Sequence, residues 1–182
     1  MSLRPIALLG DPVLRRKARK VTRFDQALQT LIEDMVETMR EANGIGLAAP
    51  QVNVLQRVIV VELPEDEEVP GSGRLYVLVN PEILRASEEM EEGIEGCLSI
   101  PGYIGEVLRH SSVVVRGQDR RGKKVRIKAE GLLARVLQHE IDHLNGVLYI
   151  DKLTAPDRIW RVEEGEEEEA EARQEMPAMV MG

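Results

Sequence analysis

The sequence predicts a single domain that contains both helices and strands, and three observations lead to that prediction. The chain has 182 residues, 43% of them apolar, which is enough for one substantial core. Apolar residues recur at three- and four-residue spacing in two long segments, as in helices that bury one face. Short runs rich in Val, Ile and Leu, bounded by Pro, Asn or Gly, lie between those segments and predict strands.

The first segment predicts a long helix over residues 25–42. Asn43 and Gly44 end it, because these residues tolerate the left-handed conformation that often follows a last helical turn. The stripe that this helix buries consists of six apolar side chains: Leu28, Leu31, Ile32, Met35, Val36 and Met39.

The runs that predict strands follow this helix along the chain. Strands are expected at residues 58–63 and 75–80, which end at a Pro and at an Asn-Pro pair. Turn residues separate two further runs, at 113–116 and 124–128, and so predict a hairpin. A last short strand is expected over residues 147–150.

The second helical segment carries the motif His139-Glu140-Ile141-Asp142-His143. Two imidazoles four residues apart lie one turn apart on the same helix face, where they can hold one metal ion. A Glu beside the first ligand can act as a general base toward water on that metal. Asn145-Gly146 ends the helix. Its apolar positions continue on both sides of the motif: Leu132, Leu133, Val136, Leu137, Ile141 and Leu144.

Cys97 is the only cysteine, so it cannot form a disulfide within the chain. A lone Cys in a cytoplasmic chain is most often a small core residue, and its other roles are nucleophile and metal ligand. It lies in a stretch flanked by Gly and Pro, residues 95–102. A thiolate and two imidazoles make a three-ligand set with an open fourth position, as in catalytic rather than structural zinc sites.

Residues 44–51, GIGLAAPQ, follow a helix rather than a strand, which disfavours a dinucleotide-binding loop. Two interpretations stay open for this stretch. It is a loop that caps a helix, or it is a backbone that another group approaches closely, since glycine has no Cβ.

Composition and charge exclude several classes of protein. The N-terminus lacks the apolar segment of a signal peptide and no apolar run is long enough to span a bilayer, so we expect a cytoplasmic protein without a membrane partner. A net charge of −8 and few aromatic residues argue against direct nucleic-acid binding. Residues 158–175 are charged and helix-prone, with acids in excess, and are expected to form a solvated helix or a disordered tail.

Three stretches together resemble the peptide deformylase family. They are GIGLAAPQ at 44–51, EGCLSIPG at 95–102 and QHEIDHLNG at 138–146, in the order and form of that family. The resemblance implies an α+β fold, in which a central HExxH helix is surrounded by small, mostly antiparallel sheets and a long helix lies near the N-terminus. It implies a catalytic domain over residues 1–153 and a charged helix or tail, partly disordered, over 154–182.

The resemblance also implies an activity and a set of site residues. The activity is hydrolytic removal of the formyl group from the N-terminal formyl-methionine of newly synthesised polypeptides. Cys97, His139 and His143 match the metal ligands of the family, and Glu140 matches its acid/base catalyst. The remaining matches are the groups that hold the formyl oxygen and the backbone that meets the substrate: Gln51, the N–H of Leu98, and Gly46.

The methionine side chain of the substrate requires an apolar pocket. Ile45, Val136 and the aliphatic stem of Arg135 are expected to line it because they adjoin the motifs. The ligand types alone favour zinc, whereas the resemblance implies one Fe²⁺ per chain in the cell, with Zn²⁺, Ni²⁺ or Co²⁺ able to occupy the site in a purified sample. Nascent formyl-methionyl peptides are the expected partners. Transient ribosome association is compatible with the resemblance, although the acidic tail is poorly suited to docking on RNA.

Two alternative functions are weighed beside this one. An HExxH zinc peptidase would cleave internal peptide bonds, but the chain has no His after His143 and that function leaves EGCLSIPG unexplained. A non-enzymatic, ribosome-associated metal-binding relative would have lost Glu140 or Cys97, and both are present. Glu95, Arg109 and Asp142 are expected either to orient metal ligands or to form an ordinary surface ion pair.

Overall fold

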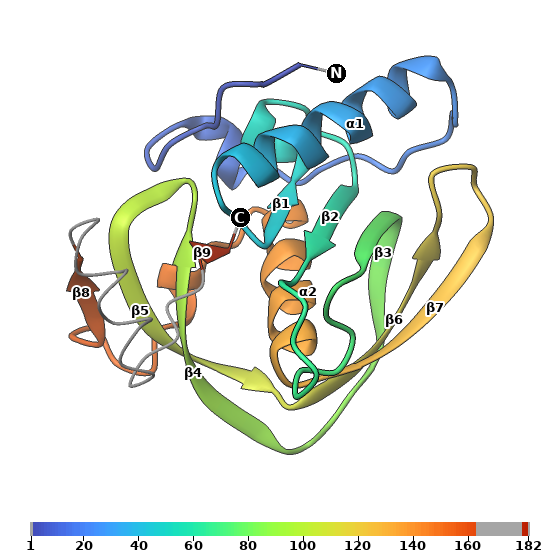
Figure 1. The fold of residues 1–182 in the computed structure, drawn as a ribbon. Helices are drawn as coiled ribbons and strands as arrows, with labels where there is room; N and C mark the ends of the chain where they lie inside the picture. Colours follow the sequence, from blue (N-terminus) through green and yellow to red (C-terminus); the bar gives the residue numbers. More distant parts are fainter. Residues whose placement is uncertain (1, 163–179, 182) are drawn as a thin grey trace.

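The computed structural model describes residues 2–162 and 180–181, which form an α+β arrangement of helices and mainly antiparallel sheets (Figure 1). Its α-helices are α1 (Gln26–Glu41) and α2 (Gly131–Leu144). Short 3₁₀ helices lie at η1 (Pro12–Arg15), η2 (Ala49–Val52) and η3 (Tyr149–Lys152). The strands are β1 (Gly46–Ala48), β2 (Val58–Glu62), β3 (Leu75–Ala86), β4 (Met90–Cys97), β5 (Ile100–His110), β6 (Ser112–Gln118), β7 (Lys124–Glu130), β8 (Ile159–Arg161) and β9 (Val180–Met181).

Helix α1 lies within the range that its apolar periodicity predicts. It begins after Asp25, whose side chain accepts a hydrogen bond from the Leu28 N–H at 3.0 Å and so caps the first turn. It ends at Ala42, and Asn43 follows with a φ of 54°. The predicted apolar stripe is buried and packs against β1 and β2. Helix α1 therefore covers one face of β1, the strand that lies within the GIGLAAPQ stretch.

The first sheet has the strand order β1-β2-β3-β6-β7, with every neighbouring pair antiparallel. Strands β2 and β3 occupy the runs predicted at 58–63 and 75–80, although β3 continues to Ala86. The predicted hairpin is β6–β7, in which Val115 pairs with Ile127. Strand β3 passes Pro81 by shifting its register between Val79 and Glu82, because Pro has no N–H to donate to the ladder.

The second sheet has the order β8-β5-β4-β9 and contains the one parallel pair among the described strands, β4 with β9. Its central hairpin, β4–β5, was not expected from the sequence. Residues 90–96 are acidic or glycine at most positions, so the alternation of apolar and polar residues that marks a strand is absent there. Backbone pairing with β5 and the buried Glu95 hold this strand in place instead.

Two expectations near the end of the chain are wrong. Residues 149–152 form η3 rather than part of a strand, because the Asp151 carboxylate accepts the Leu148 N–H at 2.9 Å and tightens the chain into a turn. Residues 159–161 form β8 rather than the start of a helix, because they pair with Tyr103, Ile104 and Gly105 at the edge of β5. The remainder of the predicted acidic helix, 163–175, lies outside the described residues.

Helix α2 lies between the two sheets (Figure 1). It contacts β1, β2, β3, β6 and β7 of the first sheet and β5 and β9 of the second. Most of its side chains are buried, including both histidines of the motif and Glu140. Burying polar groups without partners is costly, so a helix of this kind must satisfy them within the protein or through a ligand. None of the described helices is long and apolar enough to cross a membrane.

Candidate metal centre and active site

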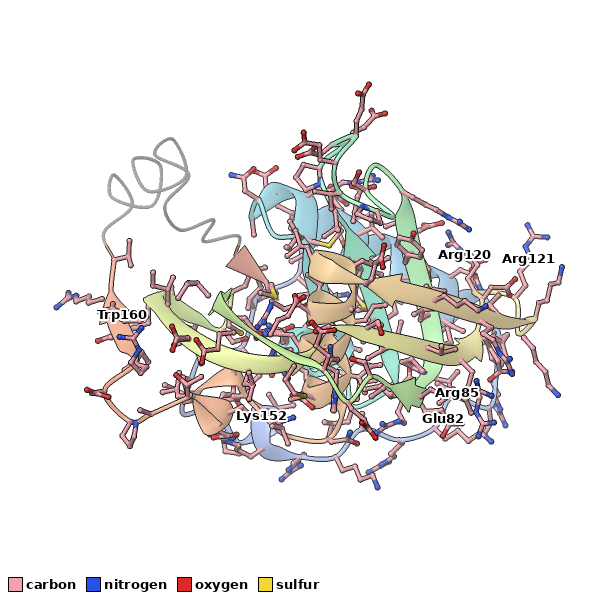
Figure 2. The ribbon with its side chains drawn as sticks, turned by 90° about the horizontal axis from the view of Figure 1, so that it is seen from below. Glu82, Arg85, Arg120, Arg121, Lys152 and Trp160 are labelled. Carbon is pink, nitrogen blue, oxygen red and sulfur yellow. The ribbon has the colours of Figure 1, made fainter. Side chains whose placement is uncertain are left out.

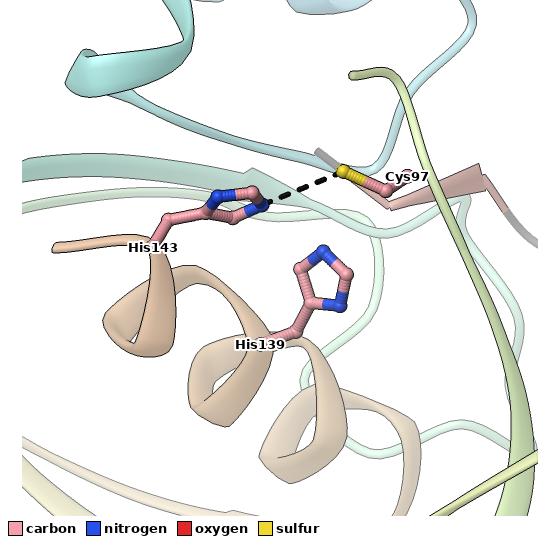
Figure 3. A group of neighbouring side chains, drawn as sticks. All are labelled: Cys97, His139 and His143. Atoms are coloured by element: carbon pink, nitrogen blue, oxygen red, sulfur yellow. Dashed lines mark hydrogen bonds between the residues drawn. The ribbon is translucent and has the colours of Figure 1, made fainter. Parts of the chain in front are cut away.

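Three side chains that can ligate a metal meet where the end of β4 approaches α2 (Figure 3). The ligand atoms of Cys97, His139 and His143 all lie within 4.8 Å of one another, and Cys97 Sγ is 3.5 Å from His143 Nε2. Sulfur and nitrogen ligands bound tetrahedrally to one zinc-sized ion lie roughly 3.5 Å apart. The Cys97–His143 distance matches this spacing, and all three ligand atoms lie close enough together to converge on one ion.

The surroundings of Cys97 favour a bound cation. Burial raises the pKa of the Cys97 thiol, and the nearby Glu140 carboxylate raises it further. A thiolate at this position needs positive charge close by, and a divalent ion supplies it. The donor set of one thiolate and two imidazoles suits soft or borderline transition-metal ions.

Glu95, on β4, orients the first histidine. Its Oε1 lies 2.8 Å from His139 Nδ1. A proton on Nδ1 that points at the carboxylate puts the lone pair of the ring on Nε2, the nitrogen that faces the ligand cluster. The sequence left the role of Glu95 open between orienting a ligand and a surface ion pair. Because Glu95 is fully buried, the second alternative is wrong.

Two arginines hold Glu95 ionised. Arg109 donates from Nε and Nη2 at 2.9 and 2.8 Å, and Arg135 donates from Nη1 at 2.7 Å. Burial by itself would raise the pKa of Glu95, but hydrogen bonds and charge from Arg109 and His139 outweigh it and hold that pKa well below its usual range. Arg109 also reaches Asp142 on α2 at 2.6 Å. The network ties β4, β5 and α2 together behind the ligands.

Arg135 is engaged in this network by its head group. Besides Glu95, its guanidinium donates to the carbonyls of Val107 and Glu91, at 3.0 and 2.7 Å. The side chain fits because Gly93 opposes it: a Cβ there would lie 2.7 Å from Arg135 Cζ. The sequence proposed only the stem of Arg135, as a pocket wall, and missed this contact because 40 residues separate Arg135 from Glu95.

Glu140 is fully buried and lies against the backbone of Gly46 in β1. A Cβ at position 46 would overlap the Glu140 carboxylate. This contact decides between the two interpretations of GIGLAAPQ: the backbone of β1 is indeed closely approached, and the approaching group is Glu140 itself. The absence of a side chain at Gly46 therefore gives the carboxylate its position.

Gln51, in η2, faces the same centre. Its Oε1 accepts the Ala48 N–H at 3.0 Å, which fixes the amide with Nε2 toward the site. Nε2 donates to Ser99 Oγ at 3.0 Å and lies 3.7 Å from Cys97 Sγ. Ser99 is buried and was not singled out from the sequence, although it lies two residues after the cysteine.

Leu98 directs its N–H at the end of the chain. The N–H donates to the Met181 carbonyl at 2.8 Å, and Met181 belongs to β9. The Met181 side chain is fully buried in the same apolar cluster as Ile45, Val136 and Leu137. The structure thus brings the predicted pocket residues Ile45 and Val136 together, around a methionine that the sequence did not point to.

Tyr149, in η3, is a further neighbour that the sequence did not indicate. Its ring stacks on the His139 ring, with centroids 6.1 Å apart and planes 21° from parallel. Tyr149 is buried in the cluster that also contains Cys97. Its position follows from the turn after α2, which no short-range pattern marks.

The chain is similar to proteins of one family over most of its length. The family model for polypeptide deformylase matches residues 3–158. A peptide deformylase from Symbiobacterium thermophilum is 55% identical over 166 residues, which are 91% of this chain and 73% of that protein.

Solved structures give the same result. The crystal structure of a peptide deformylase from Thermotoga maritima is 44% identical and superposes with a TM-score of 0.78, covering 84% of this chain and 99% of that one. A peptide deformylase from Acinetobacter baumannii, 39% identical, also superposes with a TM-score of 0.78, covering 83% and 98% of the two chains. The chain therefore belongs to the peptide deformylase family, the metal-dependent hydrolases that remove the formyl group from the N-terminus of newly made polypeptides.

Proposed function

We propose that Cys97, His139 and His143 hold the metal of this deformylase and that Glu140 is its acid/base catalyst. The observation that carries the proposal is that Cys97, at the end of β4, meets His139 and His143 on the buried helix that also presents Glu140. When bound there, a divalent ion lowers the pKa of water and polarises a carbonyl oxygen. We also propose that α2 is the central helix of the family's fold and that α1 is its long N-terminal helix.

We propose Fe²⁺ as the metal in the cell. Zn²⁺, Ni²⁺ or Co²⁺ would occupy the same site in a purified sample, because one thiolate and two imidazoles accept each of these ions. The buried carboxylate of Glu95 adds negative charge behind His139 and makes that ring a better donor.

Glu140 moves the proton in this proposal. Its carboxylate takes a proton from the attacking water and returns it to the amine of methionine as formate leaves. Glu140 is fully buried beside the ligand cluster, so bulk water does not compete for the proton that it carries. The Gly46 backbone holds the carboxylate on the side where β1 passes the site.

Gln51 and Leu98 are proposed to stabilise the charge that develops on the formyl oxygen. Gln51 Nε2 already faces the ligand cluster, and the Leu98 N–H follows Cys97 directly. Removing one such donor typically costs about two to three orders of magnitude in rate. The Leu98 N–H must exchange its bond to Met181 for one to the substrate.

Ile45 and Val136 are proposed to line the pocket for the substrate methionine, with the stem of Arg135 nearby and the backbone of Gly46 alongside the peptide. Support comes from the buried cluster around Ile45 and Val136, which already holds a methionine side chain. The Acinetobacter baumannii relative was solved with Met-Ala-Ser bound. That tripeptide is what deformylation of formyl-Met-Ala-Ser would leave.

In this proposal, residues 1–153 form the catalytic domain and residues 154–182 form a charged tail. The first part of the tail is attached to the domain because β8 pairs with β5. The protein acts on nascent chains in the cytoplasm. Any transient association with the ribosome would not use the acidic residues 163–175, because RNA repels them.

The experiment is a comparison of substrates with anaerobically prepared, iron-loaded protein. Formate should be released from formyl-Met-Ala-Ser, while an unformylated peptide of several residues stays intact. Cleavage of its internal bonds would support the zinc peptidase instead. A fully metallated protein that processes neither substrate would support a non-enzymatic relative.

A further inference from the structure

The last described residues of the chain occupy the edge of β4 at the metal centre. Val180 and Met181 form β9, which runs parallel to β4 with Gly96 opposite Val180 and Cys97 opposite Met181. Figure 1 shows β9 beside α2, between β4 and the end of β1. An added strand of this kind is the way in which many proteins bind extended peptides.

The backbone of β9 uses a donor that the reaction needs. The Leu98 N–H donates to the Met181 carbonyl at 2.8 Å. As long as this bond persists, the same N–H cannot stabilise a formyl oxygen. The chain and the substrate therefore compete for one hydrogen-bond donor.

The side chain of Met181 competes with the substrate for a second feature, the apolar pocket. It is fully buried in the cluster that contains Ile45, Val136 and Leu137. Of these, Ile45 and Val136 are the residues proposed to receive the methionine of the substrate. A methionine side chain from the chain itself thus lies in the same apolar cluster as the residues proposed to receive the methionine of the nascent peptide.

We propose that β9 is an internal competitor of the substrate, with Met181 as its anchor. Two states follow: one with β9 on β4, and one in which β9 has left and a formyl-methionyl peptide takes both the Leu98 donor and the pocket. The inference rests on the proposed function for the meaning of the pocket. The contact of β9 with β4 stands independently of it.

The test uses the full-length, metal-loaded chain and the substitution Met181→Asp. Burial of the Met181 side chain favours the state in which β9 lies on β4 over the state in which it has left, by on the order of ten-fold or more. Its loss should lower KM for formyl-Met-Ala-Ser by about ten-fold and leave kcat unchanged, since a competitor affects only the free enzyme. Met181→Leu should behave like the unsubstituted protein, because it keeps an apolar anchor. Met90→Asp, at the far end of β4, is the matched control and should not alter KM.

Amide hydrogen exchange tests the contact of β9 with β4 without relying on formate release. The Leu98 N–H should exchange slowly in the unsubstituted chain and much faster in Met181→Asp. If no variant released formate, the proposed function would fail while the exchange of Leu98 still tested the contact. The proposal is overturned if Met181→Asp has the KM of the unsubstituted chain and the Leu98 N–H exchanges equally fast in both proteins.

A different observation, the distribution of charge, carries a second inference. Residues 112–130 hold seven Lys or Arg and two acids, a net of +5, in a chain of net −8. We call the exposed cations of the β6–β7 hairpin the basic hairpin: Arg116, Arg121, Lys123, Lys124, Arg126 and Lys128. In Figure 2, Arg120 and Arg121 extend from its outer end. The charge is therefore concentrated on one hairpin, whose turn is held against α1 by hydrogen bonds between Gln29 and Arg120.

The cations of β7 share one face. Lys124, Arg126 and Lys128 are exposed, whereas Val125 and Ile127 between them pack on the core. Arg116 pairs with Glu82, but among the described residues the other five members of the basic hairpin form no ion pair. Most of this positive charge is therefore left for an external partner.

A second basic segment adjoins the hairpin. Residues 1–24 carry seven Lys or Arg and one acid. Asn80 connects the two segments: its Oδ1 accepts the Val21 N–H at 2.8 Å and its Nδ2 donates to Gln118 at 2.8 Å. The exposed cations Lys20 and Arg23 thus lie near the turn end of the hairpin, where Gln118 pairs with Lys124.

We infer that the basic hairpin docks on the phosphate backbone of double-helical RNA. The sequence predicted no nucleic-acid partner, but net charge averages over a local surface of opposite sign. Residues 112–130 contain no aromatic side chain on which single-stranded bases could stack. The apolar residues of β7 point into the core, so none is available to enter a lipid bilayer.

The test is the binding of a fluorescently labelled RNA hairpin to the full chain at several salt concentrations. Lys124→Gln/Arg126→Gln should weaken binding several-fold and reduce the slope of log K against log salt by about two, one for each lost phosphate contact. Arg74→Gln/Arg161→Gln removes the same charge from exposed positions elsewhere and should leave the slope unchanged. Equal slopes for the two variants overturn the inference, as does binding to vesicles containing phosphatidylserine but not to RNA.

Discussion

At the scale of single residues, the site depends on side chains that are absent as well as on those present. Gly46 leaves the space that the Glu140 carboxylate occupies, and Gly93 leaves the space for the Arg135 guanidinium. Neither requirement could be derived from the sequence, because each glycine opposes a residue more than 40 positions away. Spacing predicted the helical ligands directly, since His139 and His143 are one turn apart.

Gly46→Ala should damage catalysis more than folding. The added methyl group displaces the Glu140 carboxylate, and a misplacement of about 1 Å can cost roughly 100-fold in rate. Steady-state formate release measures the loss of kcat. Gly44→Ala is the control: the tight contact of its methyl group would be with the end of the Leu98 side chain, at 2.8 Å, which can move, and its contact with the Met39 carbonyl oxygen at 3.6 Å is ordinary. Equal losses in the two variants would show that the Glu140 contact is not the cause.

Glu95→Gln should weaken both the metal site and the fold. It removes the charge behind His139, which typically costs about 10- to 100-fold in metal affinity. It also leaves the buried Arg109 and Arg135 without their shared carboxylate, a loss of about 3–5 kcal/mol in the free energy of unfolding. Metal competition and urea unfolding measure the two effects.

The matched control for this variant is Glu82→Gln, which breaks the exposed pair with Arg116. Both side chains of that pair are more than half exposed, so the loss should stay below about 1 kcal/mol. If Glu95→Gln were as mild as Glu82→Gln, the buried network would not be what positions His139.

At the scale of elements, apolar periodicity was a sufficient guide wherever one face of an element is buried. It located α1, and runs of apolar residues bounded by turn residues located β2, β3 and the β6–β7 hairpin, although β2 is buried on both faces over most of its length. It did not find the β4–β5 hairpin, whose acidic and glycine-rich first strand is held by pairing and by the buried Glu95. It misjudged η3 and β8, because a side-chain cap and the free edge of β5 decide their conformations.

The element η3 gives a test of packing beside the metal centre. The Tyr149 hydroxyl is buried and has no hydrogen-bond partner among the described residues, whereas its ring stacks on His139. Tyr149→Phe should therefore leave the free energy of unfolding unchanged or higher, since a buried unsatisfied hydroxyl costs about 1–3 kcal/mol. Tyr149→Ala should lose about 3–5 kcal/mol through the cavity it creates. Thermal unfolding compares them, and a loss in Tyr149→Phe as large as in Tyr149→Ala would show that the hydroxyl holds the element.

At the scale of the whole molecule, the site is assembled from three stretches that are distant in sequence. GIGLAAPQ supplies Gly46 and Gln51, EGCLSIPG supplies Cys97 and Leu98, and α2 supplies the histidines and Glu140. Physical patterns in the sequence indicated a metal and a base on one helix. Ligand chemistry offered Cys97 as a third ligand, and only the resemblance to a family joined GIGLAAPQ and Leu98 to the site, because spacing carries no information across 40 or more residues. Neither approach pointed to β9, since pairing at the edge of β4 is a property of the folded molecule.

The central claim, that Glu140 performs proton transfer beside a metal held by Cys97, His139 and His143, is tested most directly by formate release in Glu140→Gln. Protein loaded with one equivalent of metal is compared with the unsubstituted chain and with Glu89→Gln, an exposed glutamate before β4. We predict that all three retain the metal and that only Glu140→Gln loses rate, by roughly 100- to 10,000-fold. A metal-loaded Glu140→Gln variant that released formate as fast as the unsubstituted protein would contradict the account.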